Sequence, residues 1–188
     1  MTAALKKFLA GYVNLSSAEM DSIVSKFKEK TVKKNEYLLR EEQVCKDLIF
    51  VEEGCLRLYY VADGVEVSVW FSFKHSSAIE ISSFLSGKPT NYFLQAIEDS
   101  EILFLPKTEL NKLYHSQPKV QEMMRLFLED VVLNLIDRFT ALQRDAAEKR
   151  YKNLLKKPAY LQKVPQKYLA SFIGVTPTSL SRIRRKIK

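Results

Sequence analysis

Residues 164–187 read VPQKYLASFIGVTPTSLSRIRRKI, and this stretch predicts two short helices joined by a tight turn. Pro165 suits the start of the first helix, and Gly174 supplies the left-handed backbone that ends it. Thr176 and Pro177 then favour the start of the second helix. The inner face of both helices is apolar at helical spacing, at Leu169, Phe172, Ile173, Leu180, Ile183 and Ile187. The pattern is typical of a helix-turn-helix.

The outer face of the second predicted helix is polar and basic. An arginine on such a face can bind a guanine edge with two hydrogen bonds, and hydroxyl groups can bind phosphates. We therefore expect double-stranded DNA as a partner, contacted by the residues on or near this face: Thr178, Ser179, Ser181, Arg182, Arg185 and Lys186. Helical pairs with a glycine turn also occur in proteins that do not bind DNA, and this alternative stays open.

Positive charge is concentrated in the same part of the chain. Residues 144–188 contain 13 Lys or Arg and 2 Asp or Glu, a net charge of +11, whereas the whole chain carries +8. The other residues, 1–143, therefore carry a net charge of about −3. A local excess of this kind favours a polyanionic partner, because each neutralised phosphate releases counterions. A solvated basic tail is the alternative.

The preceding region, from about Glu36 to Leu105, predicts a β-rich domain. Asp63-Gly64 between two alternating runs is a strong hairpin signal. The predicted strands are short and separated by turns, at 37–39, 48–51, 55–61, 65–73, 92–97 and 101–105, with a helical piece at 82–86. This spacing is typical of an antiparallel sandwich or jelly roll. Helices are expected before it, over 3–10 and 16–30, the second with a capping box of Ser16 and Glu19.

A long helix is expected from Pro118 to about Leu142, after a short helix over 106–113. Its apolar residues recur at spacings of three and four, which is typical of a helix that packs lengthwise against another. We expect it to join two copies of the chain through a stripe of apolar side chains: Val120, Met124, Phe127, Val131 and Leu135. A helix packed only within its own chain is the alternative. A further helix over 146–156 is stopped by Pro158.

Several classes of protein are disfavoured by composition. The chain is 46% hydrophobic and 28% charged, with neither an apolar run of bilayer length nor the apolar core of a signal peptide, so we expect a cytoplasmic protein without a membrane partner. Cys45 and Cys55 are too few for a disulfide framework or an iron–sulfur cluster. His75 and His115 are isolated, so we expect no metal site. An enzyme is not expected, because metal-dependent β-roll enzymes need clustered ligands.

The order of elements resembles the cyclic-AMP receptor protein family, also called Crp/Fnr regulators. Three motifs carry the resemblance: LIFVEEG at 48–54, EKRY with two leucines at 148–155, and LA-x-x-IGVT-x-TS-x-x-R at 169–182. The resemblance implies an α+β fold with three parts. They are a double-stranded β-helix (jelly-roll, cyclic-nucleotide-binding-like) sensor domain over 1–117, a dimerisation helix over 118–144, and a helix-turn-helix domain over 145–188.

The resemblance also implies a function and roles for particular residues. It implies a homodimeric transcription regulator that binds specific DNA sequences, has RNA polymerase as a further partner, and moves at a hinge near 144–147. Arg182 would contact a base edge with Thr178 nearby, while Thr176 and Ser179 would contact phosphates. Pro177 and Thr178 stand where family members often carry Arg and Glu, so the preferred operator sequence is open.

The effector pocket departs from the family pattern. The family binds its nucleotide with a Gly-Glu pair on a short helix and an Arg-Ser pair about ten residues later; here these places hold Ile79-Glu80 and Thr90-Asn91. The phosphate-binding Arg is therefore missing, and Lys88 is a flexible substitute. A cyclic nucleotide is the implied effector, but this departure argues against it, and we expect an unknown effector or none. The expected pocket residues are Glu80, Ile81, Lys88, Thr90 and Asn91, with a helix-capping role as the alternative for Glu80.

A second function stays open beside DNA binding. A cyclic-nucleotide-binding-like domain can serve as a scaffold or an RNA-binding module that recognises no operator. Single-stranded bases usually stack on exposed aromatic side chains. The aromatic residues of the basic segment fit core or linker packing better: Tyr151, Tyr160, Tyr168 and Phe172.

Overall fold

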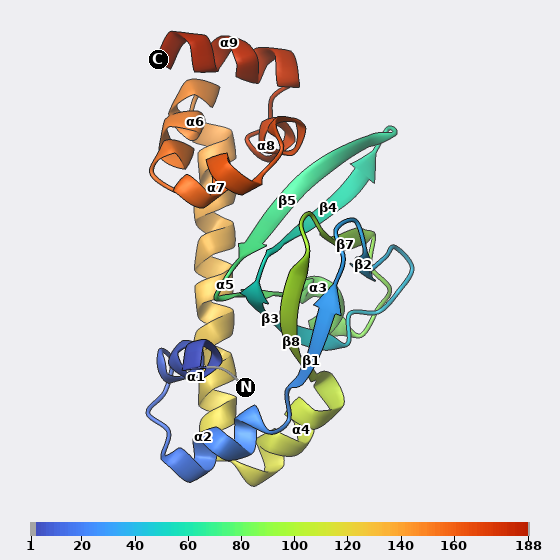
Figure 1. The fold of residues 1–188 in the computed structure, drawn as a ribbon, viewed down its shortest axis with the longest axis vertical. Helices are drawn as coiled ribbons and strands as arrows, with labels where there is room; N and C mark the ends of the chain where they lie inside the picture. Colours follow the sequence, from blue (N-terminus) through green and yellow to red (C-terminus); the bar gives the residue numbers. More distant parts are fainter. Residues whose placement is uncertain (1–2, 188) are drawn as a thin grey trace. The chain divides into compact units, whose positions relative to one another are not determined.

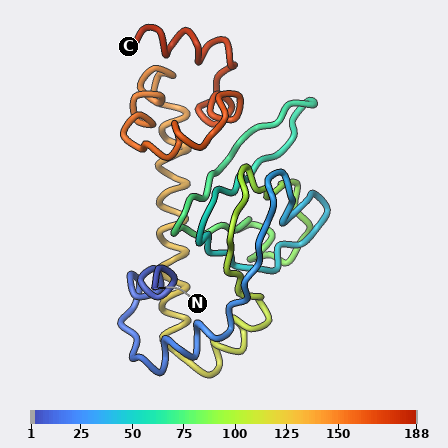
Figure 2. The backbone as a smooth tube through the Cα atoms, viewed as in Figure 1, coloured from blue at the N-terminus to red at the C-terminus, as the bar shows by residue number. Residues whose placement is uncertain are grey.

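The computed structural model describes residues 3–187, which form two four-stranded sheets and a set of helices (Figures 1 and 2). The chain divides into two compact units. The first, here called the β-roll unit, comprises residues 3–58 and 71–130. The second, here called the helical unit, comprises residues 59–70 and 131–187.

The sheets of the β-roll are antiparallel, as predicted. One sheet has the order β1 (Lys28–Val32), β8 (Ser100–Pro106), β3 (Asp47–Glu53) and β6 (Ser76–Ala78). The other has the order β2 (Tyr37–Leu39), β7 (Tyr92–Ala96), β4 (Cys55–Ala62) and β5 (Val65–Phe73). Ile49 of β3 pairs with Phe104 of β8, and apolar residues from both sheets are completely buried, among them Val51, Leu56 and Leu105.

The turn between β4 and β5 forms as the sequence predicts. Asp63 and Gly64 both have positive φ, 50° and 74°. Two successive residues of this kind match the twist of antiparallel strands, and Asp-Gly adopts such a turn readily. The tip of this hairpin, residues 59–70, belongs to the helical unit.

Helices flank the sheets of the β-roll unit. They are α1 (Ala3–Ala10), α2 (Ser17–Val24), α3 (Ile81–Ser86), α4 (Lys107–Ser116) and the first half of α5 (Pro118–Arg144). The predicted capping box is present at the start of α2, where Ser16 and Glu19 cap each other's backbone amides. Phe127 of α5 packs against the rings of Phe8 and Tyr12, so the first half of α5 belongs to this core.

Three elements differ from the sequence prediction. The helix predicted over 16–30 ends at Val24, and residues 28–32 form β1 instead, because they pair along their whole length with β8. Strand β6 was not predicted; it pairs with β3. Pro158 does end the preceding helix, but it also begins α7 (Pro158–Lys163), since a proline costs little at a first helical position.

The helical unit contains the second half of α5, followed by α6 (Ala147–Leu155), α7, α8 (Gln166–Phe172) and α9 (Pro177–Ile187) (Figure 1). Its core contains five of the six apolar residues that the sequence places on inner faces: Leu169, Phe172, Ile173, Leu180 and Ile183. The sixth, Ile187, is half-buried, and Tyr151 and Leu154 of α6 complete the core. Within residues 3–187, none of the helices combines the length and the apolar composition that a membrane-spanning segment needs.

Candidate nucleic-acid interface

The turn between α8 and α9 has the predicted geometry. Gly174 lies in the left-handed region with φ 69°, and its amide donates to the carbonyl of Ser171 at 3.0 Å. Thr176 caps α9, because its Oγ1 accepts a hydrogen bond from the amide of Ser179 at 3.1 Å. The two hydroxyl groups are also 3.0 Å apart. Both side chains predicted to contact phosphates therefore lie at the N-terminus of α9.

The outer face of α9 carries the predicted DNA-binding side chains. Thr178, Arg182 and Arg185 are exposed and lie at positions i, i+4 and i+7, which places them on one face of the helix. Lys186 is also exposed, and its Nζ lies 3.2 Å from Oε1 of Glu148 in α6. The opposite face docks α9, since Leu180 is completely buried.

Two arginines that the sequence analysis did not single out hold the end of α8. Arg138 of α5 donates from Nη2 to the carbonyl of Phe172 at 2.8 Å. Arg150 of α6 donates from Nε to the next carbonyl, that of Ile173, also at 2.8 Å. The guanidinium of Arg138 also lies 3.7 Å from the centre of the Phe172 ring, and burial lowers the pKa of Arg138 to about 10. The helix-turn-helix is thus attached to both α5 and α6 at adjacent backbone positions.

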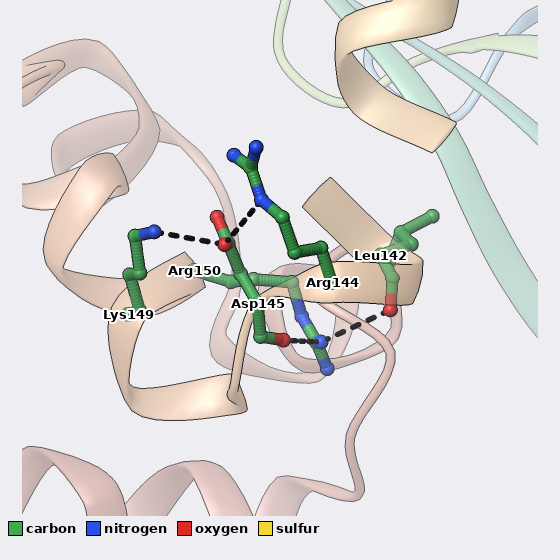
Figure 3. Close-up of polar contacts among 5 residues, drawn as sticks. All are labelled: Leu142, Arg144, Asp145, Lys149 and Arg150. Carbon is green, nitrogen blue, oxygen red and sulfur yellow. Dashed lines mark hydrogen bonds and ion pairs between the residues drawn. The ribbon is translucent and has the colours of Figure 1, made fainter. Parts of the chain in front are cut away.

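The predicted hinge near residues 144–147 is held by a second set of contacts (Figure 3). Arg150 also donates from Nη1 to the carbonyls of Leu142, at 3.3 Å, and Asp145. The buried carboxylate of Asp145 accepts from Lys149 Nζ at 2.9 Å and from Arg144 Nε at 3.3 Å. Both hydrogen bonds lower the pKa of Asp145, and the bond from Lys149 has the larger effect. Arg150 therefore binds carbonyls in and just after the last turn of α5 and, at the same time, the carbonyl that directly follows α8.

The tip of the β4–β5 hairpin contacts α8 within the helical unit. The amide of Ser68 donates to Oγ of Ser171 at 3.1 Å, and the two hydroxyl groups lie 2.9 Å apart. Arg138 extends the contact by donating to the carbonyl of Ser68 at 3.4 Å. The residue types alone do not indicate this contact, because it joins segments about one hundred positions apart.

In the β-roll unit, Glu80 takes the helix-capping role that was left as an alternative. It is the N-cap of α3 and is 3% exposed. Its Oε1 accepts from the amide of Ser82 at 3.1 Å, and its Oε2 accepts from the amide of Ser83 at 2.9 Å. Both oxygens of this carboxylate therefore bind the first turn of its own helix.

The other predicted pocket residues follow Glu80 along α3 and the segment that leads to β7. Ile81 is half-buried, whereas Lys88 and Asn91 are exposed. Thr90 is buried, its amide donates to the carbonyl of Gln43 at 2.9 Å, and its Oγ1 accepts from the amide of Tyr92. The buried cation of the β-roll unit is Arg57 in β4, which the sequence analysis did not single out.

The cysteines and histidines form no cluster. Cys45 and Cys55 are both free and buried, and burial raises the pKa of the Cys45 thiol. The ring of His75 stacks on that of Phe50. Across residues 3–187, no group of three or more His, Cys, Asp or Glu side chains is arranged to bind a metal ion.

Comparison with known protein families finds a match for part of the chain. Residues 29–117 match the family described as the cyclic nucleotide-binding domain. This match covers seven of the eight strands described here in full, with α3 and α4 between and after them. These residues are therefore similar to the cyclic nucleotide-binding domain family. No curated protein sequence matches the chain.

Solved structures resemble almost the whole chain. FixK2 from Bradyrhizobium japonicum aligns with a TM-score of 0.74 and 17% identity, over 86% of this chain and 84% of its own. A protein assigned to the Crp/Fnr family of transcriptional regulators, from Eubacterium rectale, aligns with a TM-score of 0.71 and 16% identity, over 92% and 83%. The chain has the Crp/Fnr fold.

A third solved structure shares the Crp/Fnr fold over a similar length. CLP from Xanthomonas campestris, described as a c-di-GMP-responsive global regulator, aligns with a TM-score of 0.69 and 13% identity, over 92% of this chain and 91% of its own. At these identities the likeness is one of fold. It confirms the predicted fold class, with a jelly roll, a long helix and C-terminal helices, and both of these neighbours are described as regulators.

Proposed function

We propose that this chain is a homodimeric transcription regulator that binds specific sequences in double-stranded DNA. In this proposal residues 1–117 act as a sensor, 118–144 dimerise and 145–188 bind DNA. The observation that carries it is the exposed face of α9, where Thr178, Arg182 and Arg185 stand together on a helix docked by buried residues. Such a helix fits the major groove, where arginine can bind guanine.

Dimerisation is supported by an exposed apolar stripe on the second half of α5. Ile136 is 54% exposed and Phe139 is 61% exposed, and Val132 and Leu135 lie on the same face. Large apolar side chains in a contiguous exposed row usually mark an interface. Of the residues expected in this role, Val120, Met124 and Phe127 are buried within their own chain, Val131 is half-buried and Leu135 is exposed. We therefore propose that the exposed residues of the second half of α5 form the interface. Two copies joined here would present two α9 helices to major grooves about 34 Å apart.

We propose that the β-roll pocket has diverged from the cyclic-nucleotide pocket of the family that the sequence resembles. There the Glu binds the ribose and an Arg binds the phosphate. Here both oxygens of Glu80 already accept from α3 amides, and residues 90 and 91 are Thr and Asn. We therefore propose a diverged pocket, with a different effector or none, and RNA polymerase as a further partner of the DNA-bound dimer.

The alternative of an RNA-binding scaffold has less support. Stacking of single-stranded bases needs exposed aromatic rings. Tyr151 and Phe172 are buried, and Tyr160 packs against Phe172 with ring centres 5.3 Å apart. Tyr168 is half-buried, and Nζ of Lys167 lies over its ring. The basic helices thus lack an aromatic platform built from these residues.

Selection from a random double-stranded DNA library at physiological salt tests the proposal, with and without cyclic AMP. We expect a palindromic site to be enriched, and the Arg182→Ala, Arg185→Ala double variant to bind that site at least about tenfold more weakly. Lys112→Ala, which removes an exposed cation of the β-roll unit, should bind as tightly as the wild type. Enrichment of no site, equal binding by the double variant, or preference for single-stranded RNA would contradict DNA recognition. Tighter binding with cyclic AMP would contradict the diverged pocket.

A further inference from the structure

A pocket of about 420 Å³ lies in the β-roll unit, between α1, the first half of α5 and the turn that joins β5 to β6. Helix α1 packs against α5 at this place (Figure 1). The pocket volume lies within the range of about 300–1,000 Å³ that is usual for small-molecule sites. Its lining contains neither the predicted effector-pocket residues nor the proposed DNA contacts, so the proposed function does not explain it.

Aromatic rings supply the apolar part of the lining. The ring of Phe8 packs against those of Phe50 and Phe127, with ring centres 5.3 and 6.3 Å apart. The Tyr12 ring lies 5.9 Å from that of Phe127, and the His75 ring is stacked on that of Phe50. Rings held by packing in this way offer a preorganised surface to the ring of a ligand.

His75 lines the pocket from a backbone position that suits glycine. Its φ is 63°, in the left-handed region that glycine adopts without strain. Its amide donates to the carbonyl of Val51 at 2.6 Å, which fixes the turn against β3. Residues held in such conformations cluster at functional sites. An exposed imidazole at this place therefore supports a binding role for the pocket.

Two opposite charges also line the pocket. Lys7 is exposed on α1 beside Lys6, but Lys6 pairs with Asp21 at 2.7 Å whereas Lys7 lines the pocket. Asp130 is exposed on α5, and its carboxylate accepts a hydrogen bond from the hydroxyl of Tyr12. Burial, followed by the charge of Asp130 and this hydrogen bond, raises the pKa of Tyr12. The phenol therefore stays protonated and orients the carboxylate.

The balance of these charges favours one class of ligand. The net charge of the lining is zero, with one lysine and one aspartate and with histidine counted as neutral. An anion would be attracted by Lys7 and repelled by Asp130, and a cation would meet the reverse. A zwitterion suits both residues, because each of its charges can pair with the opposite one.

Dimerisation through the exposed stripe of α5 would leave Asp130 accessible. Successive residues of an α-helix are rotated by about 100° around its axis, which places Asp130 about 200° from Val132 and about 180° from Phe139. Asp130 therefore lies on the side of α5 opposite the stripe. A partner seated on the stripe would not cover this carboxylate.

We propose that this pocket binds a free α-amino acid with an aromatic side chain. The carboxylate of the amino acid pairs with Lys7 and its ammonium group pairs with Asp130. The aromatic side chain lies against Phe8 and His75. The inference goes beyond the proposed regulator function, and its test depends neither on DNA binding nor on dimerisation.

Calorimetric titration of the full-length protein without DNA tests the proposal. L-phenylalanine is compared with hydrocinnamate, which lacks the ammonium group, with phenethylamine, which lacks the carboxylate, and with glycine, which lacks the ring. We expect L-phenylalanine to bind with a Kd at least about tenfold lower than that of each analogue, because each analogue leaves one part of the pocket unpaired. Equal affinity for any analogue, or no saturable heat from L-phenylalanine at millimolar concentration, would overturn the proposal.

Two pairs of substitutions locate the binding. Lys7→Gln with Asp130→Asn removes both charges from the pocket and should weaken L-phenylalanine binding at least about tenfold. The control pair, Lys6→Gln with Asp21→Asn, removes the same charges from an ion pair that does not line the pocket, and it should leave the Kd unchanged. Equal Kd values for the two pairs would mean that the amino acid binds elsewhere and would overturn the assignment.

The single variant Lys7→Gln shows which group of the ligand Lys7 binds. It should weaken the binding of L-phenylalanine and hydrocinnamate, which carry a carboxylate, and leave that of phenethylamine unchanged. Because the three probes are compared on one protein, a general effect of the substitution on folding would change all three affinities alike. An equal loss for all three probes would overturn the proposed pairing.

Discussion

Glu80 illustrates how one carboxylate can serve structure where a related pattern serves ligand binding. Its two oxygens bind the amides of Ser82 and Ser83, and its side chain is buried. We expect Glu80→Gln to lower the free energy of unfolding by about 1 kcal/mol, because the amide side chain keeps only one acceptor and loses the charge. Urea denaturation measures the change. Glu122→Gln, on an exposed position of α5, is the control. Unchanged stability of Glu80→Gln would show that the carboxylate is not needed as a cap.

Arg150 is the residue on which three helices of the helical unit converge. It binds the carbonyl of Ile173 at the end of α8 and those of Leu142 and Asp145 at the end of α5. A lysine at this position cannot reach acceptors in several directions, because it offers one ammonium instead of a planar fork. Arg150→Lys should therefore cost about 1–2 kcal/mol of unfolding free energy in urea. Arg184→Lys, on exposed α9, should cost much less; equal losses would contradict the role of Arg150.

At the scale of helices and strands, short sequence motifs predict those elements that are stabilised by interactions within a few residues. The helix-turn-helix could be placed from Gly174, Thr176 and Pro177, because a left-handed turn, a cap and a first-position proline act within a few residues. Strand β1 could not be predicted in this way, because its stability comes from pairing with β8, about seventy positions away. The strand propensity of single residues is a weak guide where distant partners decide whether a strand forms. The capping box of α2 was predictable for the same reason as the helix-turn-helix.

Contacts to the backbone explain most of what the sequence did not reveal about the site. Arg138 and Arg150 bind carbonyl oxygens, which every residue has, so no complementary side chain marks their partners. Helix α5 shows a related limit. Its apolar spacing continues along the helix, yet Phe127 is buried in its own chain whereas Phe139 is exposed. Periodicity indicates a packed face, but only the tertiary fold shows which neighbour covers it.

The whole molecule is proposed to work as a pair of chains, because one chain leaves the stripe on the second half of α5 uncovered. Wild-type protein should therefore have about twice the monomer mass of 21.8 kDa at micromolar concentration, measured by light scattering after gel filtration. Ile136→Asp with Phe139→Asp places two charges in that stripe and should give the monomer mass, since burying unpaired charges is strongly unfavourable. Leu85→Asp changes an equally exposed leucine of α3 and should leave the dimer intact.

The monomeric variant should keep its helical circular dichroism but lose affinity for a palindromic site, because each α9 would then bind only one half-site. A wild type of monomer mass, or a double variant that remains a dimer, would place the interface elsewhere or remove it.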